Sequence, residues 1–151
     1  VVILVAAAVI DYRHMVIPNL LTYPAIILGL VMTARWQNGL LRGFHGAVVG
    51  VLILSFMYWL GRLLYRREAV GMGDFKLAAA IGVFVGPFWC ATALIIAIVI
   101  GGITGIVLMA TGKTKRFSEV PFGPFISTGA LAAVFFRPQL LFLIEKYLSI
   151  L

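Results

Sequence analysis

Long apolar runs separated by short polar stretches dominate this chain. Six apolar segments can be traced, at about residues 1–10, 20–34, 44–64, 75–85, 88–110 and 122–136. Polar and apolar residues do not alternate within them, which excludes the pattern of a transmembrane β-barrel and is typical of membrane helices. We therefore expect an all-α, polytopic membrane protein with about six transmembrane helices, and residues 1–151 as a single domain.

The pattern is irregular at both ends of the chain. The first segment shows only ten residues before Asp11, whereas a full span needs about 20 residues, so we expect it to be the truncated end of a longer helix. The tail "RPQLLFLIEKYLSIL" is expected either to extend the sixth helix past a kink at Pro138 or to lie at the membrane interface.

Composition supports a membrane protein. The chain is 63% hydrophobic, with a mean hydropathy of +1.12, and only 11% of its residues are charged, compared with about 25% in soluble domains. The net charge of +7 is not arranged as a basic stripe interleaved with aromatic residues, so no nucleic-acid partner is expected. Membrane lipid is the expected partner of the basic loops. The single cysteine, Cys90, is expected to be a small buried side chain.

The basic residues also predict an orientation. Eight of them fall in or beside the turns after the first, third and fifth segments: Arg13, Arg62, Arg66, Arg67, Lys76, Lys113, Lys115 and Arg116. The turns on the other side carry Arg35 and Arg42. The positive-inside rule places the first group in the cytoplasm and the N-terminus outside. Asp11 and Asp74 then lie at the same depth on the cytoplasmic side.

Asp11 and Asp74 stand apart from the other acidic residues because each adjoins an apolar segment. Glu68, Glu119 and Glu145 occur in charged or terminal stretches and are expected at the surface. Ionisable residues at membrane depth are rare and usually functional. Three interpretations remain open: Asp74 caps a helix while Asp11 pairs with a nearby cation, the two acids form an ion or proton path, or they act together in catalysis.

The stretch "EAVGMGDFKLAAAIG" (68–82) favours catalysis. Gly71 and Gly73 precede Asp74, and glycine allows another backbone to approach closely. An extended peptide substrate needs such access. Two carboxylates that share one proton can then hydrolyse an amide, one as a base toward water and one as an acid toward the carbonyl oxygen.

Three motifs resemble those of the type IV prepilin peptidases, intramembrane aspartyl proteases of the GxGD kind. "DYRHMVIPNLLTYP" (11–24) resembles the first-aspartate motif with its Ile-Pro-Asn/Asp-x-Leu turn. "GMGDFKLAAAIG" (71–82) resembles the second-aspartate motif, and "EVPFGPFISTGA" (119–130) the Pro-Phe-Gly-Pro segment. Their order and spacing cover nearly the whole chain.

The resemblance implies that Asp11 and Asp74 are catalytic and that no metal or cofactor is needed. It also implies a prokaryotic inner-membrane enzyme that acts at the cytoplasmic face. Its substrates would be prepilin or pseudopilin precursors, cut between a basic leader and the apolar helix. The motif residues that carry over are Gly71, Gly73, Lys76, Pro121, Phe122, Gly123 and Pro124. Lys76 would tune the dyad electrostatically or reach toward lipid headgroups, and the last four would shape the site.

The chain departs from the longer family members in one respect. Those members carry an additional N-terminal region with paired CxxC motifs, linked to N-methylation of the product, and this sequence has one cysteine. We therefore expect a short form without that region, or a trimmed chain. Two alternative functions are kept: a presenilin-like protease, disfavoured by the absence of Pro-Ala-Leu, and a small transporter that uses both acids as an ion site.

Overall fold

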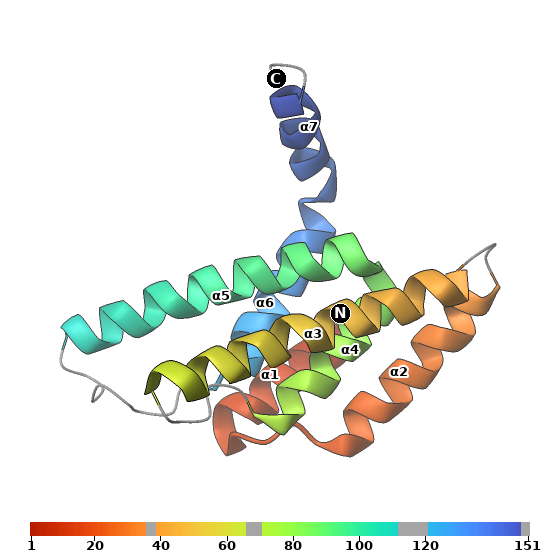
Figure 1. Ribbon diagram of the computed structural model, residues 1–151. Helices are drawn as coiled ribbons and strands as arrows, with labels where there is room; N and C mark the ends of the chain where they lie inside the picture. The colour runs from red at the N-terminus through yellow and green to blue at the C-terminus, as the bar shows by residue number, and fades with distance from the viewer. Residues whose placement is uncertain (36–38, 66–70, 112–120, 149–151) are drawn as a thin grey trace.

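The described part of the protein is entirely helical. The computed structural model describes residues 1–35, 39–65, 71–111 and 121–148, and these contain helices and no strand. The helices, drawn in Figure 1, are α1 (Val2–His14), α2 (Asn19–Ala34), α3 (Gly39–Tyr65), α4 (Met72–Val85), α5 (Pro87–Ala110), α6 (Gly123–Phe135) and α7 (Arg137–Leu148). The expected helical class is thereby confirmed.

Two of these helices, α3 and α5, are long and apolar enough to cross a membrane by length and composition. They pack against each other and run side by side across the molecule (Figure 1). Ile95, Val99 and Ile103 of α5 are each more than half exposed, and residues four apart share one face of a helix. An exposed apolar face of this kind is suited to contact with lipid.

The short helix α4 lies at the centre of the bundle and packs against α2, α3, α5 and α6. Leu77, Ala78 and Val83 are almost completely buried. Small residues allow this close approach: a Cβ added to either Gly46 of α3 or Gly82 of α4 would overlap the backbone of the other helix. Backbone-to-backbone crossings of this type are common where helices pack in membranes.

Helix α6 is held by a second small-residue contact. A Cβ added at Gly129 would meet the backbone of Ala93 and Ala97 in α5, so α5 and α6 also cross closely. The opposite side of α6 packs against α1. Cys90 is buried between α5 and α4, where its thiol lies 3.7 Å from the carbonyl oxygen of Ala78, which confirms the expected packing role.

The tail forms a helix that follows the sixth helix after a break, close to the expected kink at Pro138, and the alternative of a position at the membrane interface stays a prediction. Helix α6 ends at Phe135, and α7 begins at Arg137 and points away from the bundle, transverse to α3 and α5 (Figure 1). Pro138 lacks an N–H and its ring opposes the preceding turn, so the helix breaks there. The guanidinium of Arg137 lies 5.1 Å from the centre of the Trp89 ring, which fixes the start of α7 beside α5.

Replacing Gly82 by alanine is expected to destabilise the protein by about 1–3 kcal/mol, because the new methyl group would overpack the α3–α4 crossing. Gly102→Ala is the matched control, since a Cβ there would meet nothing within 4 Å. Alanine favours a helix over glycine by up to about 1 kcal/mol, so the control should be neutral or stabilised. Thermal unfolding in detergent measures both, and equal midpoints would contradict the close crossing.

Candidate active site

Asp11 lies in the last turn of α1, and its side chain is buried with 6% exposure. The helix ends four residues later at Met15, which has a left-handed conformation (φ 52°) and donates its N–H to the carbonyl oxygen of Asp11 at 2.8 Å. The chain then turns through Ile17 and Pro18 into α2. This turn leaves the Asp11 carboxyl facing the interior of the bundle.

Asp74 lies in the first turn of α4 and is buried to the same extent, with 6% exposure. Its Oδ2 accepts the N–H of Gly71 at 3.1 Å. This is the reach-back contact by which a side chain at the third helical position satisfies an otherwise unpaired donor. Asp74 therefore caps the start of α4, as one interpretation of the sequence predicted. This contact uses only one of its two carboxyl oxygens.

The fold brings the two carboxyls, 63 positions apart in the sequence, near enough for the charge of Asp11 to act on Asp74. They meet where α1 ends and where α4 and α6 begin. Helix N-termini carry partial positive charge and unpaired N–H groups. Two of the three helix ends therefore offset the negative charge that this site would hold.

The Pro-Phe-Gly-Pro segment touches this pair directly. The N–H of Gly123, the first residue of α6, donates to Oδ2 of Asp11 at 2.8 Å in a buried contact. A Cβ added at Gly123 would lie 2.6 Å from Oδ2 and 2.9 Å from Cγ of Asp11, so only glycine fits here. Phe122 and Phe125 flank this contact and pack against the core, and Gly101 of α5 lies against both rings.

The two motif glycines before Asp74 differ in their surroundings. A Cβ added at Gly73 would lie 2.9 Å from Cβ of Ile17, so Gly73 lets the turn between α1 and α2 pack against the start of α4. Gly71 is exposed, and a Cβ there would make only an ordinary contact of 3.5 Å with Asp74. The sequence predicted access for a substrate at both glycines and missed the packing contact of Ile17.

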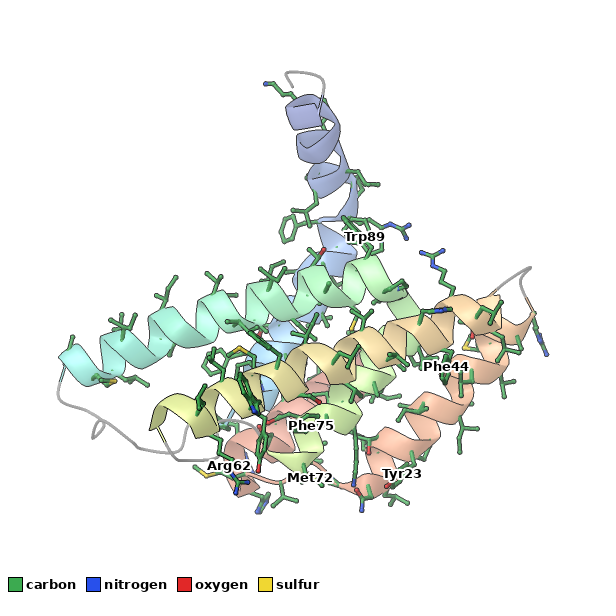
Figure 2. All side chains as sticks on the ribbon, in the orientation of Figure 1. Tyr23, Phe44, Arg62, Met72, Phe75 and Trp89 are labelled. Carbon is green, nitrogen blue, oxygen red and sulfur yellow. The ribbon has the colours of Figure 1, made fainter. Side chains whose placement is uncertain are left out.

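Lys76 does not contact the dyad as far as the described residues extend. Its ammonium donates to Oδ1 of Asn19 at 2.5 Å and lies 5.1 Å from the centre of the Tyr23 ring. Both partners belong to α2, and sequence reasoning overlooked them although they stand in the first-aspartate motif. Figure 2 shows Tyr23, Met72 and Phe75 at the end of the bundle where α4 begins, far from Trp89.

The structure describes only some of the remaining ionisable side chains. His14, in the last turn of α1, is exposed. Glu68, Glu119 and the side chain of Glu145 lie outside the described residues. Within the described ranges there is no group of three or more His, Cys, Asp or Glu residues that could hold a metal ion.

Comparison with known proteins agrees with the motifs. The profile of the type IV leader peptidase family matches residues 1–106. The prepilin leader peptidase/N-methyltransferase of Stutzerimonas stutzeri is 32% identical over 138 residues, which are 91% of this chain and 48% of that protein. The protein of the same name from Burkholderia pseudomallei is 35% identical over 134 residues, or 88% of this chain and 43% of its own length.

A third relative, also named prepilin leader peptidase/N-methyltransferase, from Pseudomonas aeruginosa, is 29% identical over 142 residues, covering 91% of this chain and 48% of that protein. The chain thus spans about half the length of these relatives. No solved structure shows significant similarity to it.

Fold and site together define an all-helical protein with a buried pair of aspartates at the junction of three helix ends. With a family match over most of its length, the chain belongs to the type IV leader peptidase family.

Gly123→Ala is expected to destabilise the protein by about 1–3 kcal/mol, because the added methyl group would displace the Asp11 carboxyl and overpack the site. Combining it with Asp11→Ala removes the two atoms of closest contact, Oδ2 and Cγ. The double variant should therefore lose less stability than the sum of the single losses. Thermal unfolding of all three, with Gly71→Ala as the tolerated control, measures this. Strictly additive losses would contradict the contact.

Proposed function

We propose that this chain is the peptidase portion of a prepilin leader peptidase. It hydrolyses the bond between the basic leader and the apolar helix of type IV prepilin or pseudopilin precursors. The observation that carries the proposal is the buried pair formed by Asp11 and Asp74 in a chain that belongs to the type IV leader peptidase family. The printed names of its relatives support the same reaction class.

The chemistry follows from two carboxyls that share one proton. The ionised carboxylate takes a proton from water, whose oxygen attacks the carbonyl carbon of the scissile peptide bond. The protonated carboxyl donates to the carbonyl oxygen, and the tetrahedral intermediate collapses when the amide nitrogen leaves with a proton. Each Oδ2 already accepts a backbone N–H, from Gly123 for Asp11 and from Gly71 for Asp74. The Oδ1 atoms are therefore the ones assigned to water and substrate. Neither a metal nor a cofactor takes part.

We assign the substrate's approach to the side of the dyad where Gly71 is exposed. A substrate in extended conformation can hydrogen-bond to backbone there without meeting a side chain. Gly73 and the segment from Pro121 to Pro124 support the site from within, since Gly73 faces Ile17 and Gly123 faces Asp11.

We place the enzyme in the inner membrane of a prokaryote, with about six spans, the N-terminus outside and the dyad at the cytoplasmic face. The helices α3 and α5 are long enough to span, and the shorter α2 and α6 are apolar. Arg13 and Arg62 are exposed in the last turns of α1 and α3, at the end where the positive-inside rule expects cations. Lipid and the precursor are the proposed partners.

The test is cleavage of a purified prepilin with its leader intact, by the chain in liposomes, with the cut position read by mass. Asp11→Asn and Asp74→Asn should each lower kcat by about 10²–10⁴-fold or more, because each removes one acid–base group. Thermal unfolding checks that the variants remain folded.

Gly102→Ala is the matched control, since a Cβ there would meet nothing within 4 Å, and it should keep wild-type cleavage. Wild-type cleavage by Asp11→Asn or by Asp74→Asn would exclude the dyad. If cleavage is absent throughout and ion-dependent stability disappears in Asp11→Asn and Asp74→Asn, the transporter function replaces the proposal. Cleavage of non-pilin membrane helices at equal rates would favour a protease of presenilin-like specificity.

A further inference from the structure

Lys76 is a half-buried cation close in sequence to Asp74 that the proposed chemistry does not use. Its ammonium is held on α2 by two groups, the Oδ1 of Asn19 at 2.5 Å and the ring of Tyr23 at 5.1 Å. Both contacts lie at the exposed start of α2, where a hydrogen bond from a charged donor and a cation–π contact act together on one side chain. The pair of contacts therefore ties the start of α4 to the start of α2.

Asp74 and Lys76 point to different sides of α4. Residues two positions apart in a helix do not share a face. The carboxyl of Asp74 accepts the N–H of Gly71 and lies within electrostatic range of Asp11, while the ammonium of Lys76 donates to Asn19 of α2. The cation is thus poorly placed to neutralise the dyad, although it stands on the same helical turn.

Because Asn19 is close to Asp11 in the chain, its contact with Lys76 limits how far Asp11 and Asp74 can separate. Asn19 follows Asp11 by eight positions, through the turn that ends α1 and starts α2. Within that turn, Ile17 packs against Gly73, the residue before Asp74. A closed ring results, in which Asp11 leads through the turn to Asn19, Asn19 binds Lys76, and Lys76 leads back along α4 to Asp74.

We propose that Lys76 is a positioning residue that fixes the separation of Asp11 and Asp74 by clamping α4 to Asn19 of α2. Two carboxyls near enough to interact repel one another when both are charged, and this repulsion acts to move the start of α4 away from the end of α1. The clamp opposes that displacement mechanically. The inference rests on the proposed dyad. It adds a residue that acts by setting the distance between the two acids and not by the effect of its charge on them.

Kinetics of prepilin cleavage separate these two roles. Lys76→Met keeps the apolar stem and removes the ammonium. It should lower kcat by about 10- to 100-fold, because small misplacements of reacting groups cost this much, while KM stays within about twofold. The pH optimum should stay where it is in the wild type. Lys76→Arg should restore most of the rate, since a guanidinium can donate to Asn19 and stack on Tyr23.

Arg35→Met is the matched control, because it removes an exposed cation from the far end of α2 and should leave kcat unchanged. A shifted pH optimum with normal kcat at the new optimum would show an electrostatic role for Lys76 and overturn the proposal. Unchanged kcat in Lys76→Met would overturn it as well.

A second measurement does not depend on proteolysis. Lys76→Met, Asn19→Leu and the double variant form a cycle in thermal unfolding, in detergent. The double variant should lose little more stability than Lys76→Met alone, because that change already breaks the contact with Asn19. Additive losses would overturn the clamp even if cleavage is normal. Absent cleavage by the wild type, together with a non-additive cycle, would overturn the proposed function and leave the clamp standing.

Discussion

Two charged carboxyls that interact within a protein interior repel each other, and much of the surrounding structure offsets this repulsion. Charges removed from water cost free energy unless other groups compensate them. Asp11 and Asp74 are compensated by backbone N–H groups at the starts of two helices, Gly123 for one and Gly71 for the other. These compensating groups are backbone amides, which cannot move away and do not titrate. This arrangement holds the two acids in place without a neighbouring cation that would neutralise them, within the part of the chain that the structure describes.

The same constraint explains why so many small residues lie in the bundle. Asp74 is buried only because α4, a helix of 14 residues, is surrounded by other helices. That arrangement requires α3 to approach α4 at Gly46 and Gly82, and α5 to approach α6 at Gly129. Each crossing replaces side-chain packing with backbone contact and brings the helix ends near one another. The glycines distant from the acids therefore serve the site by shaping the scaffold around it.

Part of this arrangement could be predicted from the sequence. Apolar runs without alternation predicted the helices. The two acids next to such runs were predicted to lie at the same depth on the cytoplasmic side, which stays a prediction, and the structure brings them near enough for the charge of Asp11 to act on Asp74. The helix starts were less accurate, since Gly39 and Met72 begin α3 and α4 several residues before their apolar runs. Contacts between a side chain and a distant group could not be predicted. The bond from Gly123 to Asp11 spans 112 positions and that from Lys76 to Asn19 spans 57, and neither leaves a periodic trace. The number of spans, their orientation and the roles of the motif residues stay predictions.

The bond between Gly123 and Asp11 has a consequence for biosynthesis. These two residues are 112 positions apart, and ribosomes add about 5–20 residues each second. Asp11 therefore waits roughly 6–22 seconds in the nascent chain before its backbone partner has been made. During that interval α1 carries a carboxyl without its donor, so this side chain gains from remaining near water. The buried contact between α1 and α6 can form only after α6 has been synthesised.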